Sequence, residues 1–145
     1  MTLHMHDATG ERLGRVLVVD DEDAIRKVAV RSLTRAGYEV VEADNGECAI
    51  SALNADDNPL MVDAILCDIH MPKINGHEAI AYFRKQYPGV PVVVLTGYPE
   101  VDRAVGLMKA GVMDYLVKPI SKDDLVKVIA RAVESHDILK DQFAV

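Results

Sequence analysis

The chain has 145 residues, of which 50% are hydrophobic and 27% charged, so it is long enough for one soluble domain with its own core. Its formal net charge of −7 argues against nucleic acid or an anionic membrane as a direct partner, because both require a basic surface. The two cysteines have neither metal-site nor redox spacing, and no apolar run approaches the ~20 residues that span a bilayer, so we expect a cytoplasmic protein.

Short β-branched runs alternate along the chain with stretches whose apolar residues recur at helical spacing. In chain order we expect a strand over 15–20, a helix over 24–36, a strand over 39–43, a helix over 45–53, a strand over 64–68, a helix over 76–86, a strand over 91–95, a helix over 99–110, a strand over 113–117 and a helix from 122 to at least 135. This alternation predicts an α/β fold with a doubly wound, five-stranded parallel sheet that helices cover on both faces.

One domain is expected over residues 15–135. Residues 1–14 are expected to form a disordered or loosely attached arm, and residues 136–145 either extend the last helix or begin a linker. Residues 54–59 have the composition of a turn. Gly106 lies inside the expected fourth helix, where glycine is unfavourable. We expect that a close packing contact requires the glycine there, in preference to the alternative that it loosens the helix.

Polar residues stand where the expected strands end. The first strand ends in Asp20 and Asp21, the third in Asp68, the fourth in Thr96 and the fifth in Lys118. In an open α/β sheet the ligand site lies beyond the carboxyl ends of the strands, so we expect these five side chains to converge if the central strands are neighbours. Glu22 and Asp23 are interpreted only as acids in the first turn of the following helix.

Three carboxylates at one place repel each other, and one of them would take up a proton unless a cation lay between them. Mg²⁺ suits this set because it takes hard oxygen ligands. An ionised Asp68 is then available as a nucleophile towards phosphorus, as in aspartyl phosphates. Lys118 and the hydroxyl of Thr96 can meet the negative oxygens of the phosphoryl group in transit.

Four motifs in order carry a family resemblance: Val-Val-Asp-Asp ending at 21, Asp-Ile-His-Met-Pro-Lys-Ile-Asn-Gly over 68–76, Val-Val-Leu-Thr-Gly ending at 97, and Asp-Tyr-Leu-Val-Lys-Pro over 114–119. Together they resemble the receiver domain of bacterial two-component response regulators, over roughly residues 15–135. The resemblance implies the flavodoxin-like, CheY-like order of strands, 2-1-3-4-5.

The resemblance also implies the metal ligands. Asp21 and Asp68 are expected to bind Mg²⁺ directly, Asp20 directly or through water, and His70 through its backbone carbonyl. Mn²⁺ is expected as a substitute. Asp68 is the implied phosphoacceptor.

Further roles concern the phosphoryl group and the response to it. Thr96 and Lys118 are expected to bind phosphoryl oxygens, and the Lys118–Pro119 bond is expected to be cis. Tyr115 occupies the aromatic switch position, so it is expected to turn into space that Thr96 vacates. The surface of the fourth helix, fifth strand and fifth helix would then be rebuilt for a partner.

The implied function is a switch rather than a conventional enzyme: the domain catalyses its own phosphoryl uptake and slow autodephosphorylation. A sensor histidine kinase or a histidine phosphotransfer protein would donate the group. A downstream effector protein or an output domain absent from this chain would read the result, and a homodimer through the switch surface is a habit of the family.

Three other functions fit the sequence less well than a phosphorylation switch. A Mg²⁺-dependent phosphohydrolase of the haloacid dehalogenase type carries its nucleophile in an Asp-x-Asp after the first strand, whereas Asp20 and Asp21 are adjacent here. A flavodoxin-like flavin carrier needs a phosphate loop after the first strand that this sequence lacks. A phosphorylation-independent scaffold is disfavoured because all the key residues are present.

Three features stay open, and one departure from the family has an interpretation. The side chain of His70 either points at the site or is a solvated loop histidine, and Tyr98 either shields the phosphoryl group or lies on the surface. Ile74 replaces a methionine common in the family, which we interpret as a volume-conserving exchange. The 54–62 loop is a few residues longer than usual and is given no function.

Overall fold

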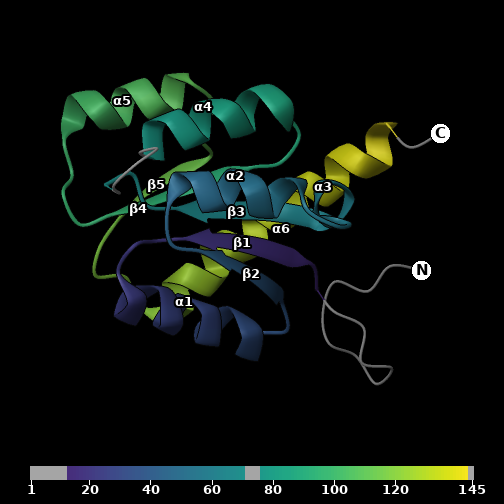
Figure 1. The fold of residues 1–145 in the computed structure, drawn as a ribbon, viewed down its shortest axis with the longest axis horizontal. Helices are drawn as coiled ribbons and strands as arrows, with labels where there is room; N and C mark the ends of the chain where they lie inside the picture. Colours follow the sequence, from purple (N-terminus) through teal and green to yellow (C-terminus); the bar gives the residue numbers. More distant parts are fainter. Residues whose placement is uncertain (1–12, 71–75, 144–145) are drawn as a thin grey trace.

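The computed structural model describes residues 13–70 and 76–143. Most of the expected N-terminal arm, the exchange at Ile74 and the end of the expected tail lie outside these residues. All five expected strands are present: β1 (Arg15–Val19), β2 (Glu39–Ala43), β3 (Val62–Cys67), β4 (Val92–Thr96) and β5 (Asp114–Val117). They form one parallel sheet in the order β2-β1-β3-β4-β5, which confirms the fold class and the strand order (Figure 1).

Six helices are described, against five expected. They are α1 (Asp23–Arg35), α2 (Gly46–Asn54), α3 (Asn58–Met61), α4 (Gly76–Gln86), α5 (Val101–Lys109) and α6 (Lys122–Phe143). The predicted fourth and fifth helices are therefore α5 and α6. None of the described helices combines the length and the apolar character that crossing a membrane requires.

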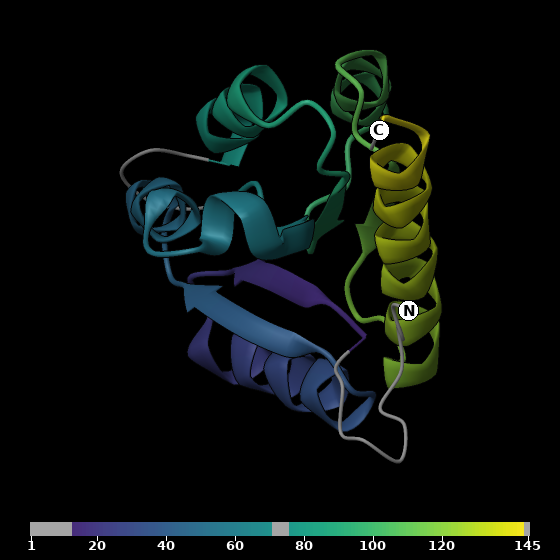
Figure 2. The same ribbon diagram turned by 90° about the vertical axis from the view of Figure 1, so that its right-hand side faces the viewer.

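The sheet has a hydrophobic core on each face, because alternate residues of its central strands point to opposite sides. From β3, Ile65 and Cys67 enter one core, whereas Ala64 and Leu66 enter the other. Helices α2, α4 and α5 cover the first core, and α1 and α6 cover the second (Figure 2). Burial on both faces explains why these strands read as continuous apolar runs.

The turn expected over residues 54–59 is wrong in part, because the structure forms the short helix α3 there. Arg15 at the start of β1 holds this helix: its Nη1 donates to Asp57 Oδ1 at 2.7 Å and to Asn58 Oδ1 at 2.9 Å. The buried Asn58 also donates from Nδ2 to the carbonyl of Ala52 at 2.7 Å. The stretch therefore has a structural role, which is to fasten α2 and α3 to the start of β1.

Strand β3 begins at Val62, two residues before the expected start. The expected start was too late because Asp63 is a charged residue that breaks the apolar run, yet it is only 6% exposed. Its Oδ1 lies 2.8 Å from Nδ1 of His136 on α6, and its Oδ2 accepts the backbone N–H of Arg15 at 3.1 Å. The contact with His136 fastens α6 to the sheet, and α6 continues from there to Phe143.

Candidate functional site

The backbone of the sheet brings the expected residues to one edge. Asp68 follows β3, and its N–H donates to the carbonyl of Val19 at the end of β1, at 2.9 Å. Asp20 follows β1, next to β3 in the sheet. The N–H of Lys118 donates to the carbonyl of Thr96 at 2.8 Å, which places the ends of β4 and β5 side by side. The convergence expected from strand ends is thus what the fold produces.

Four acidic residues form a cluster at this edge: Asp20, Asp21, Glu22 and Asp68 each contribute a carboxylate oxygen, and these oxygens all lie within 4.8 Å of one another. Asp20 and Asp68 are buried, whereas Asp21 and Glu22 are exposed. Asp20 Oδ1 accepts the N–H of Glu22 at 2.9 Å, so the turn into α1 shapes the cluster. Interpreting Glu22 only as a first-turn acid missed its place here; its position directly after the acidic pair was the available signal.

The ammonium of Lys118 lies among these carboxylates. Its Nζ is 2.9 Å from Asp20 Oδ2, 3.3 Å from Asp68 Oδ2 and 3.2 Å from Glu22 Oε1. Burial by itself lowers the pKa of Lys118, but the hydrogen bond and charge of Asp20, followed by the charge of Asp68, outweigh it, so the pKa is raised. Lys118 is therefore a fixed positive charge directed at Asp68.

The carboxyl group of Asp68 is held in a defined orientation and is only 3% exposed. Oδ1 accepts the backbone N–H of His70 at 3.0 Å, and Oδ2 faces Lys118. Burial raises the pKa of Asp68, and the charge of Asp20 raises it further, although the His70 N–H and the charge of Lys118 act in the opposite direction. The ionised form of Asp68 is thus costly in the protein without a further cation.

Thr96 and Tyr115 lie on adjoining strands but do not bond to each other in this structure. Thr96 is fully buried, and its Oγ1 accepts the N–H of Tyr98 at 3.1 Å. Tyr115 packs against the core beneath α5, and its buried hydroxyl has no hydrogen-bond partner among the described residues. The Lys118–Pro119 peptide bond is cis. The His70 ring contacts Tyr98 and Arg103, so it is not a freely solvated loop histidine.

The donor set fits a divalent cation. Four carboxylates face one ammonium, which leaves an excess of negative charge, and all the side-chain donors in the cluster are hard oxygens. Such oxygens are the ligands that Mg²⁺ and Mn²⁺ prefer. Of the expected ligands, Asp20, Asp21 and Asp68 have their carboxylates at this place, and Glu22 adds a fourth.

Gly76, the first residue of α4, is packed onto the backbone that carries Asp68. A Cβ at this position would lie 2.2 Å from the Cα of Ile69 and 2.5 Å from the carbonyl oxygen of Asp68. We expect Gly76→Ala to lower the free energy of unfolding by at least about 3 kcal/mol, since backbone atoms have no rotamer by which to move aside. Urea denaturation monitored by circular dichroism measures this effect.

Gly106 provides the matched control. A Cβ there would meet no atom within 4 Å, so the close packing contact that we expected at Gly106 is wrong. Gly106→Ala in the middle of α5 should raise the free energy of unfolding by about 0.5–1 kcal/mol, because alanine loses less entropy in a helix. Equal effects of the two substitutions would contradict the packing of Gly76 described above.

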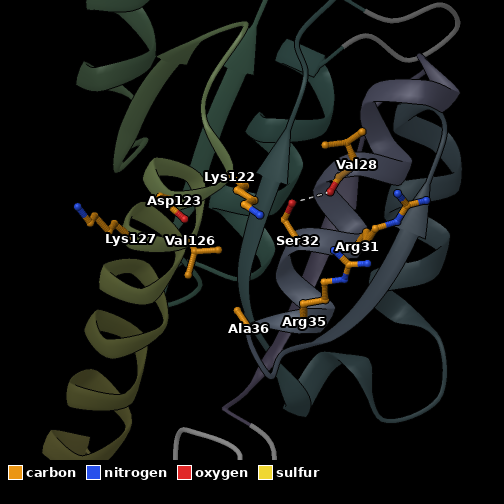
Figure 3. Close-up of a pocket in the computed structure, with 9 residues that line it drawn as sticks. All are labelled: Val28, Arg31, Ser32, Arg35, Ala36, Lys122, Asp123, Val126 and Lys127. Atoms are coloured by element: carbon orange, nitrogen blue, oxygen red, sulfur yellow. Dashed lines mark hydrogen bonds between the residues drawn. The ribbon is translucent and has the colours of Figure 1, made fainter.

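A separate groove lies between α1 and α6 and does not contain the carboxylate cluster. Its volume is about 640 Å³, and basic residues dominate its charged lining: Arg31, Arg35, Lys122 and Lys127, against Asp123 (Figure 3). The hydroxyl of Ser32 within it donates to the carbonyl of Val28 in its own helix at 2.9 Å. The residues that line the groove do not include a cluster of carboxylates with a candidate nucleophile, which is the combination found at the strand ends.

Comparison with known proteins agrees with the geometry of the site. The family description "response regulator receiver domain" matches residues 16–130. The regulatory protein AtoC of Escherichia coli is 35% identical over 129 residues, which cover 89% of this chain and 27% of AtoC. The response regulator protein FleR of Pseudomonas aeruginosa is 37% identical over 117 residues, 81% of this chain and 24% of FleR.

Solved structures give the same result. The crystal structure of a response regulator receiver domain protein from Clostridium thermocellum matches with a TM-score of 0.81 and 31% identity, covering 88% of this chain and 99% of that one. CheY4 of Vibrio cholerae matches with a TM-score of 0.74 and 30% identity, over 82% of this chain and 98% of that one. The chain thus corresponds to whole receiver domains but spans only about a quarter of AtoC and FleR.

Proposed function

The chain belongs to the response regulator receiver family, whose members are regulatory domains rather than conventional enzymes, and from this premise we propose that Asp68 is its phosphoacceptor. The observation that carries the proposal is the contact of one buried carboxylate with both a fixed ammonium and a cluster of acids. Asp68 Oδ1 accepts the His70 N–H and its Oδ2 faces Lys118. Asp20 is held in a similar way by the Glu22 N–H and Lys118, so the choice of Asp68 follows from its place at the start of the Asp-Ile-His-Met-Pro motif. An oriented, desolvated carboxylate is suited to nucleophilic attack on phosphorus.

Asp20, Asp21 and Asp68 would hold Mg²⁺, with Glu22 beside them and the backbone carbonyl of His70 as a further ligand. Mg²⁺ supplies, when bound, positive charge that keeps the carboxylates ionised and neutralises phosphoryl oxygens. Asp68 contributes the attacking oxygen: a carboxylate O–P bond forms while the bond between phosphorus and the donor's leaving group breaks. The leaving group retains the bonding electron pair.

Lys118 and Thr96 would stabilise the group during this transfer. The Lys118 ammonium already lies 3.3 Å from Asp68, so it can contact a phosphoryl oxygen without a large movement. Thr96 can donate its hydroxyl proton to another oxygen, since its present hydrogen bond uses Oγ1 only as an acceptor from Tyr98 N–H. Positioning and charge are most of what phosphoryl transfer requires of a protein.

We propose that movement of Thr96 towards the phosphoryl group is coupled to Tyr115. The buried, unpartnered hydroxyl of Tyr115 supports this role, because an unsatisfied polar group favours rearrangement. The surface that would respond consists of α5, β5 and α6. It exposes Val101, Val105 and Met108 on α5 and Val117 on β5, which suits a downstream effector, an output domain or a second copy of the chain.

The donor would be a sensor histidine kinase or a histidine phosphotransfer protein, in the cytoplasm. AtoC, FleR and other relatives are longer than this chain. An output domain in the same polypeptide is therefore one candidate for the component that responds to phosphorylation.

The proposed function predicts a Mg²⁺-dependent phosphoryl adduct. Incubation with acetyl phosphate and Mg²⁺ should add one phosphoryl group to the intact mass, and chelation of the metal should prevent this. Asp21→Ala should reduce the adduct strongly, whereas Asp123→Ala, which removes an exposed acid outside the cluster, should not. Repeated turnover of acetyl phosphate with no adduct would instead indicate a hydrolase, and no reaction at all would contradict both functions.

A further inference from the structure

A bridge of three side chains joins the two loops that border Asp68. His70 lies two residues after Asp68, and Tyr98 lies two residues after Thr96. Their rings meet edge to face, with centroids 5.1 Å apart and planes at 71°. The guanidinium Nη1 of Arg103, in the first turn of α5, lies 3.0 Å from Nε2 of His70. We call Arg103, His70 and Tyr98 the loop bridge.

The contact between Arg103 and His70 fixes the chemistry of the imidazole. A guanidinium has only N–H donors, so Nε2 of His70 accepts this hydrogen bond. Arg103 therefore sets the position of the ring and also its hydrogen-bonding state.

Other contacts hold Arg103 in this place. Its Nη2 lies 3.8 Å from Glu100 Oε2 at the start of α5. Arg103 and His77 of α4 line one groove between α4 and α5. The side chain of Arg103 is 29% exposed, so its hydrogen bond is only partly screened by water.

The backbone connects the loop bridge to the reacting groups. The N–H of His70 donates to Asp68 Oδ1, and the N–H of Tyr98 donates to Thr96 Oγ1. The residues that carry the two rings thus also orient the proposed nucleophile and the proposed phosphoryl ligand. We therefore expect a change in the position of either ring to alter the orientation of both Asp68 and Thr96.

We propose that Arg103 is a positioning residue that holds His70 against Tyr98 across these loops and thereby slows the attack of water on phosphorylated Asp68. This inference rests on the proposed function. In that attack a water oxygen forms a bond to phosphorus, the bond from phosphorus to the Asp68 oxygen breaks, and the carboxylate and inorganic phosphate are the products. The loop bridge acts by narrowing the approach of water between the two loops that border Asp68, with Tyr98 on the solvent side of the bridge.

The test measures phosphorylation and dephosphorylation separately, by intact mass at successive times after acetyl phosphate is added and after it is removed. Arg103→Ala should raise the dephosphorylation rate constant by roughly three- to tenfold, the size expected from losing one partly exposed hydrogen bond. Arg103→Lys retains a donor and should restore much of the lifetime. Lys109→Ala removes the same charge from the exposed end of α5 and should leave the lifetime unchanged.

A double variant separates positioning from a general loss of structure. His70→Ala should also shorten the lifetime, and adding Arg103→Ala to it should change little more, because Arg103 acts through His70. The thermal midpoint and the rate of uptake should stay within the range of the Lys109→Ala control. Multiplicative effects, or a lifetime in Arg103→Ala equal to that of the control, would overturn the inference. Absence of any adduct on the unsubstituted protein would overturn the proposed function and this inference together.

Discussion

Asp68→Asn should abolish the phosphoryl adduct and, at the same time, make the metal-free protein more stable. The adduct is lost because the carboxamide that replaces the carboxylate is not a nucleophile towards phosphorus. Stability rises because Asp68 is 3% exposed and faces Asp20, so its ionised form is unfavourable in the folded state without a divalent cation. We expect a gain of about 1 kcal/mol at neutral pH, a size common when a functional residue is removed.

The pH dependence of this gain follows from the raised pKa of Asp68. Between the ordinary carboxyl pKa and the raised one, the folded protein binds more protons than the unfolded chain, so stability falls as the pH rises through that window. Asn cannot titrate, so the advantage of Asp68→Asn should be full above the window and shrink as the pH falls towards about 3.9. Urea denaturation in chelator at several pH values, with the exposed Asp44→Asn as control, measures it. A destabilised Asp68→Asn protein at neutral pH would contradict the electrostatics described.

Lys118→Met should have the opposite effect on stability and a large effect on phosphoryl uptake. Removing the ammonium leaves the buried carboxylates of Asp20 and Asp68 without their partner, which should cost about 3 kcal/mol in the absence of divalent cation. The rate of uptake from acetyl phosphate should fall on the order of 10²–10³-fold, as when one charge-stabilising donor is deleted from an active site.

Mg²⁺ distinguishes these two effects of Lys118→Met. Because a divalent cation would neutralise the same carboxylates, it should restore most of the lost stability while leaving phosphoryl uptake slow. Thermal denaturation with and without Mg²⁺, and the time course of the intact mass, measure the two quantities. Lys122→Met, which removes an exposed ammonium nearby, should alter neither. Uptake at the normal rate in Lys118→Met would show that the ammonium does not act on phosphorus.

The pattern of residues was sufficient for the parallel sheet and for placing Asp20, Asp68, Thr96 and Lys118 at the carboxyl ends of its strands. Parallel strands place their carboxyl ends at one edge, so polar residues that end apolar runs must gather there. That β1 and β3 are neighbours, which brings Asp20 and Asp68 together, came from the family resemblance rather than from the pattern of residues.

The contacts that patterns of residues could not supply are those between side chains far apart in the chain. Arg103 and His70 are separated by 33 residues, and the loop bridge depends on where α5 begins. Asp63 shows the same limit, because its buried charge contacts His136 and Arg15, which lie 73 and 48 residues away in the chain. In each case local propensity was overridden by a partner that only the tertiary structure provides.

The central claim is that phosphoryl transfer occurs on the carboxylate of Asp68 and on no other residue. Reducing the phosphorylated protein with borohydride converts an aspartyl phosphate into homoserine, and peptide mapping by mass spectrometry then locates it. Our account predicts homoserine at position 68 alone, and none when Mg²⁺ is chelated. Homoserine at position 20 or 21, or an adduct that stays on a residue which borohydride does not reduce, would contradict it.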